Sequence, residues 1–183
     1  KSLLNTSFID DLVDQLLEDI PKKEIHKLPD YISKDSFKIL MTLSNLRGIP
    51  IDMSFSNEEL EGGYTMSYHK AFACFEYGKN AYPGKDESTL ELDLSKKKDL
   101  ERFLDCARAS GAFPVGLKSV SFKEIPKQYI RKNLEQIFGS LKNISPALDE
   151  IYTSGKKEYK FWAVDGGMTN NEPIAEAMKI LHS

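Results

Sequence analysis

The stretch FWAVDGGMTNNEPIAEAMKIL, Phe161 to Leu181, carries the pattern that decides the fold of this chain. Phe161 to Val164 form an apolar run that is long enough for a buried strand. Asp165-Gly166-Gly167 follows, and glycine admits backbone angles that other residues resist, so a tight turn is expected there. Apolar residues then recur at helical spacing, at Ile174, Ala177, Met178 and Leu181. The stretch therefore predicts a strand, a turn and a helix.

Asp165 would stand at the carboxyl end of this strand, where ligands gather in open α/β sheets. Taken alone, an Asp-Gly pair after a strand more often marks a turn than a site. Asn170 or Asn171 suits a helix N-cap, and Pro173 suits a first helical turn. The local pattern thus has a structural explanation, and a functional aspartate needs support from elsewhere in the chain.

The composition is that of an ordinary globular domain. The chain has 183 residues, of which 40% are hydrophobic and 29% charged. Its net charge of −3 gives no basic footprint for nucleic acid, and no apolar run approaches the roughly 20 residues of a membrane helix. Cys74 and Cys106 lack metal-ligand spacing and favour a reducing compartment. We therefore expect a cytoplasmic location, with peripheral membrane association left open.

The order of expected elements predicts an α/β layered domain whose mixed, largely parallel sheet is flanked by helices. The first expected strand begins only at Phe37. Compared with a complete doubly wound fold, the chain therefore lacks the elements of the first half. The expected elements are a helix from Ser7 to Pro21, strands at Phe37–Leu43 and Ile49–Phe55, one or two strands within 62–78, a loop at 80–98, a helix at Asp99–Ala109, helical segments within 126–153, and the terminal strand and helix.

Complete catalytic motifs are missing from the sequence. There is no G-x-S-x-G, P-loop, G-x-G-x-x-G, H-E-x-x-H or Cys-x-x-Cys, and the three histidines lie far apart. No metal and no cofactor is expected. A single aspartate cannot carry out acyl transfer without a nucleophile, so the chain alone holds no complete catalytic constellation.

Three segments together resemble the patatin-like phospholipase family. FWAVDGGMTNNEPIAEA, from Phe161 to Ala177, resembles the family's catalytic aspartate motif, a strand ending in Asp-Gly-Gly before Asn-Asn-x-Pro. CARASGAFPVGL, from Cys106 to Leu117, resembles its Ala-Ser-x-Ala-x-Pro segment. LMTLSNLRGIPIDMSF, from Leu40 to Phe55, resembles a strand that follows the nucleophile elbow in larger bacterial members. The resemblance runs from about Phe37 to the end of the chain.

The resemblance implies a hydrolase with a Ser-Asp dyad, acting in lipid degradation within a three-layer α/β fold. In that family a serine in G-x-S-x-G attacks an ester, an aspartate acts as its base, and a glycine-rich loop forms the oxyanion hole. Carried over to this chain, Asp165 is the catalytic aspartate, and Gly166 and Gly167 form the turn beside it. The serine and the oxyanion loop are absent. Residues 1–183 are therefore expected to be the C-terminal portion of one patatin-like domain, inactive alone and partnered by its N-terminal remainder.

Further expectations concern the surroundings of Asp165. A carboxylate works best as a base when partial burial raises its pKa, and Phe161, Trp162 and Phe113 were candidates for an apolar wall. Ala112, Phe113 and Pro114 are the candidate lining of a substrate channel for a lipid or small ester. Arg47 and Asn45 could contact a phosphate head group, although a capped turn with an exposed arginine is the favoured interpretation.

Other classes of function stay open at this point. The main alternative is a non-catalytic α/β module that binds lipid or protein and has no nucleophile. An anion site at the turn and helix start is opposed by Asp165 and Glu172, whose charges would repel an anion. A cation site formed by Asp165, Asn170 and Asn171 has suitable oxygen ligands but few carboxylates.

Overall fold

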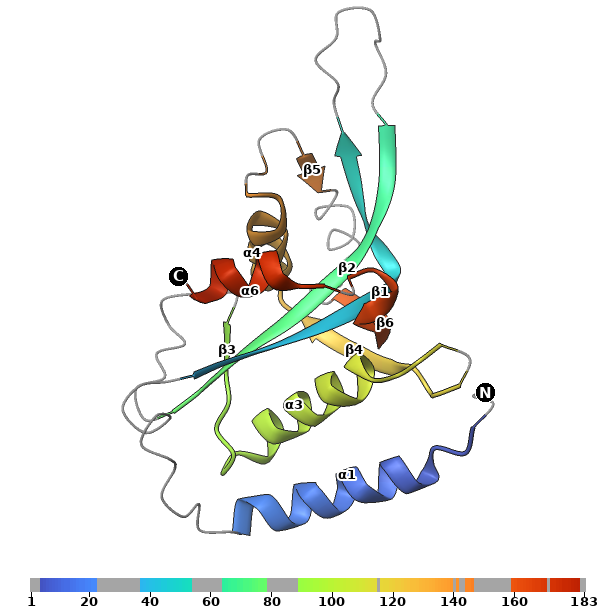
Figure 1. Cartoon of the computed structure of the whole chain (residues 1–183), viewed down its shortest axis with the longest axis vertical. Helices are drawn as coiled ribbons and strands as arrows, with labels where there is room; N and C mark the ends of the chain where they lie inside the picture. Colours follow the sequence, from blue (N-terminus) through green and yellow to red (C-terminus); the bar gives the residue numbers. More distant parts are fainter. Residues whose placement is uncertain are drawn as a thin grey trace, which may run out of the picture.

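A computed structural model describes residues 4–22, 37–53, 64–78, 89–114, 116–139, 141, 144–146, 159–170 and 172–181. Within these ranges the chain forms one mixed sheet flanked by helices, which confirms the α/β class (Figure 1). The strands lie in the order β3-β2-β1-β6-β4, and β5 also pairs with β1. Their bounds are β1 Phe37–Met53, β2 Tyr64–Tyr77, β3 Thr89–Glu91, β4 Val120–Ile125, β5 Ile144–Pro146 and β6 Tyr159–Asp165.

The expected predominance of parallel strands is wrong. Among the described strands only β2 and β3 run parallel, while β1–β2, β1–β5, β1–β6 and β4–β6 are antiparallel. Ten residues, 54–63, separate β1 from β2. A parallel crossover needs a dozen or more residues, so this connection is too short for one.

β1 is one continuous strand, where the sequence predicted two strands separated by a turn. The residues around NLRG form an irregularity inside the strand: Ser44 pairs with Lys70, and the next pair is Ile49 with Tyr68. Residues 45–48 of β1 therefore lie opposite the single residue His69. The pairing with β2 resumes beyond this point and continues to Met53. Phe55, the expected end of the second strand, lies outside the described residues.

The described helices are α1 (Ser7–Asp19), α3 (Lys97–Ser110), α4 (Lys127–Phe138) and α6 (Ile174–Leu181), with short 3-10 turns η1 (Ile20–Lys22) and η2 (Gly166–Met168). The helix predicted at Asp99–Ala109 is confirmed as α3. Figure 1 shows α3 between the sheet and α1. α4 ends where Gly139 adopts a left-handed conformation, at φ 73°. The sequence predicted helical segments within 126–153. This prediction is confirmed for α4 and is wrong for Ile144–Pro146, which form the strand β5. Residues 147–153 lie outside the described part.

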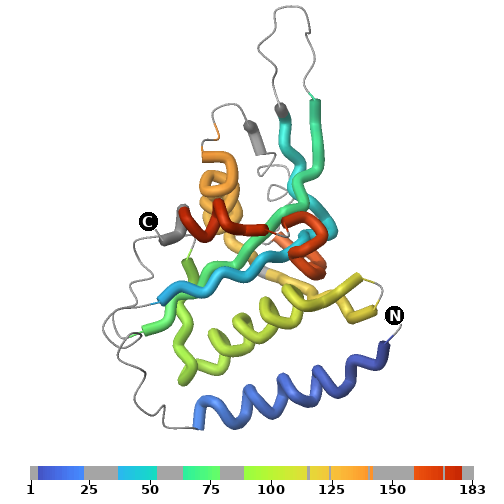
Figure 2. Tube along the Cα trace, in the orientation of Figure 1, coloured from blue at the N-terminus to red at the C-terminus, as the bar shows by residue number. Residues whose placement is uncertain are grey.

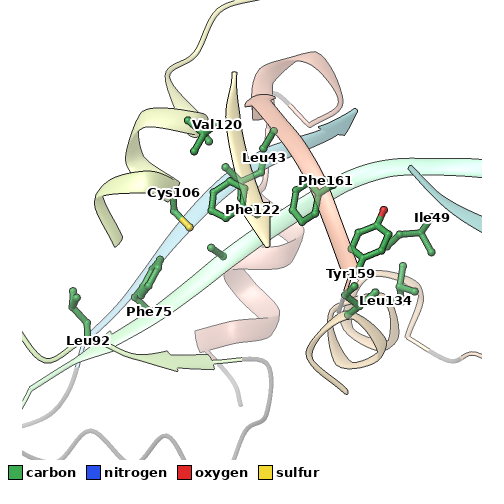
Figure 3. Close-up of a cluster of buried hydrophobic side chains, with 14 of the residues drawn as sticks. Leu43, Ile49, Phe75, Leu92, Cys106, Val120, Phe122, Leu134, Tyr159 and Phe161 are labelled. Atoms are coloured by element: carbon green, nitrogen blue, oxygen red, sulfur yellow. The ribbon is translucent and has the colours of Figure 1, made fainter. Parts of the chain in front are cut away.

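The core joins the sheet to α3 and α4. Phe122 of β4 stacks on Phe161 of β6 with ring centroids 5.4 Å apart, and Tyr159 is completely buried. Figure 3 shows Cys106 of α3 on one side of these rings, and Leu134 of α4 near Tyr159. The tube in Figure 2 shows how the C-terminal part of the chain returns to lie along β1. This return brings Asp165 to the middle of β1.

No helix in the described ranges combines the length and the apolar character needed to cross a bilayer.

Candidate functional site

Asp165 is the last residue of β6, as the sequence predicted, and three parts of the chain hold its backbone. It pairs with Leu43 of β1 in the sheet register. Its N–H donates to the carbonyl of Ala112 at 3.0 Å, and its carbonyl accepts from the hydroxyl of Ser44 at 2.8 Å. Ala112 and Ser44 belong to the other two segments that carry the family resemblance. All three segments therefore meet at one residue.

The carboxylate of Asp165 is held at one oxygen only. Its Oδ1 accepts a hydrogen bond from the N–H of Gly167 at 2.8 Å. Among the residues that the structure describes, no donor bonds Oδ2, and the side chain is only partly buried. The turn thus orients the carboxylate through Oδ1.

Gly166 is required by a close approach of two backbones. A Cβ atom at this position would lie 2.3 Å from both the carbonyl carbon and Oγ1 of Thr42, a separation that real Cβ atoms do not reach. Gly166, the first glycine of the motif, therefore allows the backbone of η2 to pack closely against that of β1. Gly167, the second, contributes its N–H to the carboxylate. Both glycines lie in η2, the 3-10 turn that begins directly after Asp165.

A polar cluster fixes the segment after Asp165 onto the sheet. Ser44 is 3% exposed, and its hydroxyl also lies 2.9 Å from Oγ1 of Thr169. Beside it in the register, Lys70 of β2 forms an ion pair with Glu176 of α6. Burial by itself raises the pKa of Glu176, but the hydrogen bond from Lys70 and its charge outweigh this effect and hold the pKa below its ordinary value.

This cluster was missed by sequence reasoning. Ser44 and Asp165 are 121 residues apart, and Lys70 and Glu176 are 106 apart. No local pattern marks such pairs. The Ser44 hydroxyl also does not supply a nucleophile for Asp165, because it bonds the aspartate's backbone carbonyl rather than its carboxylate, and it is buried.

The capped-turn interpretation of Asn45 and Arg47 is confirmed. The side-chain carbonyl of Asn45 accepts from the N–H groups of Arg47 and Gly48, at 3.0 and 3.1 Å, and Gly48 has φ 72°. The amide of Asn45 donates to the hydroxyl of Tyr159 at 2.9 Å. Arg47 donates to the carbonyl of Lys160 and lies over the Tyr159 ring, 4.9 Å from its centroid. The guanidinium therefore already has partners within the chain.

The expected apolar wall around Asp165 is not formed by all three predicted rings. Phe113 is 68% exposed and Trp162 is 47% exposed, whereas Phe161 is buried in the core. In β6 the exposed Trp162 lies between buried Phe161 and buried Ala163, as alternation along a strand requires. Of the candidate channel residues, Ala112 is buried, Pro114 is partly exposed, and only the backbone of Ala112 bonds Asp165.

Metal binding finds no support in the described ranges, where no group of three or more His, Cys, Asp or Glu side chains could hold an ion. Of the three oxygen ligands suggested by the sequence, Asn171 lies outside those ranges. Asn170 interacts with Glu176 and helps to lower the pKa of that carboxyl.

Comparisons with known proteins place the chain beside an uncharacterized relative. No protein-family model and no solved structure matches it. An uncharacterized protein of Sinorhizobium fredii, y4iI, is 26% identical over an alignment of 160 residues that covers 76% of this chain and 22% of the relative. The chain thus spans about a fifth of the length of this curated relative.

Proposed function

We propose that this chain supplies the catalytic aspartate of a patatin-like acyl hydrolase that cleaves ester bonds in phospholipids or related lipids. The observation that carries the proposal is the meeting of three segments at Asp165, through Leu43, Ser44 and Ala112. Each of these segments separately resembles a landmark of that family. A chance resemblance would have no reason to bring them together around the one residue expected to be catalytic.

The chemistry requires a serine from outside this chain. As its hydroxyl oxygen attacks the ester carbonyl carbon, Asp165 accepts the hydroxyl proton on Oδ2, and the proton then passes to the leaving alcohol. Water then attacks the carbonyl carbon of the acyl-serine and gives a proton to the same carboxylate. As the bond between that carbon and the serine oxygen breaks, the proton passes to the serine oxygen and the acid is released. The bond from Gly167 to Oδ1 keeps the carboxylate oriented through both steps. The oxyanion would be held by backbone N–H groups of the same external part.

The partner that the proposal requires is the N-terminal remainder of the same domain, carrying the serine and the oxyanion loop. The length of the relative supports a longer polypeptide, since the chain matches 22% of it. The substrate is a lipid or a small ester, reached through peripheral contact with a membrane. The place of action is the cytoplasm or its membrane surface.

The first test is to sequence the coding region directly upstream of Lys1. A glycine-rich loop and a G-x-S-x-G motif after a strand would support the proposal. An upstream region without a nucleophile would remove it and leave the alternative, a non-catalytic α/β module that binds lipid or protein.

The second test compares two aspartates in the longer polypeptide, with hydrolysis of a p-nitrophenyl ester and of phospholipid vesicles as readouts. Asp165→Asn should abolish hydrolysis, a loss of about a thousandfold or more, without loss of the folded state. Asp52→Asn is the matched control, because Asp52 is an exposed strand residue whose carboxylate accepts a hydrogen bond from Thr65. Near-wild-type hydrolysis by folded Asp165→Asn protein would refute the dyad.

A further inference from the structure

A second candidate site lies away from Asp165, where the edge strands β3 and β4 approach α3 and the start of α4. A cleft of about 860 Å³ opens there. It adjoins an apolar chamber of about 80 Å³ inside the core. The two spaces share Leu90, Arg102, Phe122, Ile125 and Tyr129. The cleft and the chamber therefore lie side by side, the cleft wide and polar and the chamber narrow and apolar.

The chamber is suited to an alkyl chain. Its walls come from β1, β6 and α4, and they include Leu43, Ile49, Phe161, Ile130 and Leu134, all of which are buried. An apolar space of this kind stays dry and gains contacts when an apolar group enters it. Its volume matches the end of a short aliphatic chain rather than a whole lipid tail.

The mouth of the cleft offers a guanidinium donor. Arg102 of α3 is half-buried, lines both spaces, and makes no hydrogen bond or ion pair with any residue that the structure describes. A guanidinium fork binds a carboxylate through two parallel hydrogen bonds.

The other charged side chains that line the cleft differ from Arg102 in position. Asp105 lies 3.9 Å from Arg108, which also lies 3.3 Å from Asp10, and Glu101 is exposed to solvent. Lys98 and Lys123 are exposed cations on the same cleft and do not line the chamber. Among the described residues of the cleft, Arg102 is therefore the cation that also borders the apolar chamber.

We infer that the cleft and the chamber bind an aliphatic carboxylate, with its head group on Arg102 and its alkyl tail in the chamber. This inference does not rest on the proposed hydrolase function, because neither Asp165 nor Ser44 nor Ala112 lines either space. A carboxylate bound there would occupy a site separate from the catalytic aspartate.

The test uses the 183-residue chain with labelled isoleucine and leucine methyl groups, titrated with hexanoate and observed by NMR. The methyl signals of Ile130 and Leu134 should shift in a saturable manner. Hexan-1-ol, which has the same tail without the charge, should bind about tenfold more weakly or worse. Equal binding of the alcohol and the acid, or an absence of methyl shifts with hexanoate, would overturn the inference.

Variants locate the head group. Arg102→Gln should weaken hexanoate binding by about tenfold or more, and Arg102→Lys should retain part of it. Arg131→Gln is the matched control, since Arg131 is an exposed helical arginine that lines neither space. If folded Arg102→Gln bound hexanoate as the wild type does, the head group would not lie on Arg102. If Arg102→Gln does not fold, the comparison of hexanoate with hexan-1-ol on the wild-type chain still tests whether the site recognises a carboxylate.

Discussion

The hydroxyl of Ser44 donates a hydrogen bond to the backbone carbonyl of Asp165 across 2.8 Å, and this contact joins β1 to the end of β6. The contact is to the backbone of Asp165 and not to its carboxylate. Ser44 is therefore a positioning residue, which fixes where the strand ends and where the turn to η2 begins. Its second contact, to the hydroxyl of Thr169, holds the far side of the same turn.

Replacing Ser44 by alanine should lower the free energy of unfolding by about 1–2 kcal/mol, because a partly buried acceptor loses its donor. Urea titration followed by circular dichroism measures this change. Thr65→Ala is the matched control: Thr65 bonds Asp52 at an exposed position, and its loss should change the free energy by less than about 0.5 kcal/mol. Equal effects of the two substitutions would mean that the Ser44 contact adds nothing.

Gly166→Ala should be strongly destabilising, by about 3 kcal/mol, because the added methyl group meets both the backbone carbonyl group and Oγ1 of Thr42. Thermal and urea unfolding both report the loss. Gly111→Ala serves as the control, since a Cβ atom there approaches nothing closer than 3.8 Å and its φ of −102° is open to alanine. A Gly166→Ala protein as stable as the wild type would contradict the close packing of η2 on β1.

Tyr159→Phe should cost about 2–3 kcal/mol, because its hydroxyl links two buried groups of the Asn45 turn. It donates to the carbonyl of Gly48 at 2.8 Å and accepts from the amide of Asn45. Tyr64→Phe removes a hydroxyl from a ring that is 65% exposed and should leave the unfolding midpoint unchanged. If both substitutions were neutral, the irregularity in β1 would be held by Asn45 alone.

The sequence predicted the features whose causes are local. The strand before Asp165 follows from an apolar run, and α3 follows from helical spacing. The turn at Asn45 follows from an amide beside a glycine. Each of these depends on neighbours within a few residues, so each leaves a pattern in the chain.

The direction of the strands and the support of the site were not predictable in the same way. A buried strand has the same composition in a parallel and in an antiparallel pair, so the apolar character of Phe37–Leu43 could not show that β6 runs against it. The need for glycine at position 166 arises from Thr42, more than a hundred residues earlier. Such requirements are set by the tertiary structure and become visible only in it.

The ion pair of Lys70 and Glu176 should make stability depend on pH in the acid range. The pKa of Glu176 in the folded protein lies below its ordinary value of 4.5. The folded state therefore favours the charged form, and its contribution is complete above about pH 4.5. That contribution disappears as the pH falls through the lowered pKa, because the carboxylate is then protonated in both states and the attraction to Lys70 is lost. α6 should be the first element affected, since Glu176 attaches it to β2.

Glu176→Gln isolates this effect. The variant should be less stable than the wild type at pH 7, and the difference between them should shrink as the pH falls from 4.5 to 3, because glutamine does not titrate. Urea midpoints measured between pH 3 and pH 7 test both statements. Glu91→Gln removes a more exposed carboxylate, 3.8 Å from Lys96, and should leave the wild-type profile almost unchanged, because solvent screens exposed pairs. A wild-type profile parallel to that of Glu176→Gln at every pH would show that the pair does not attach α6 to the sheet.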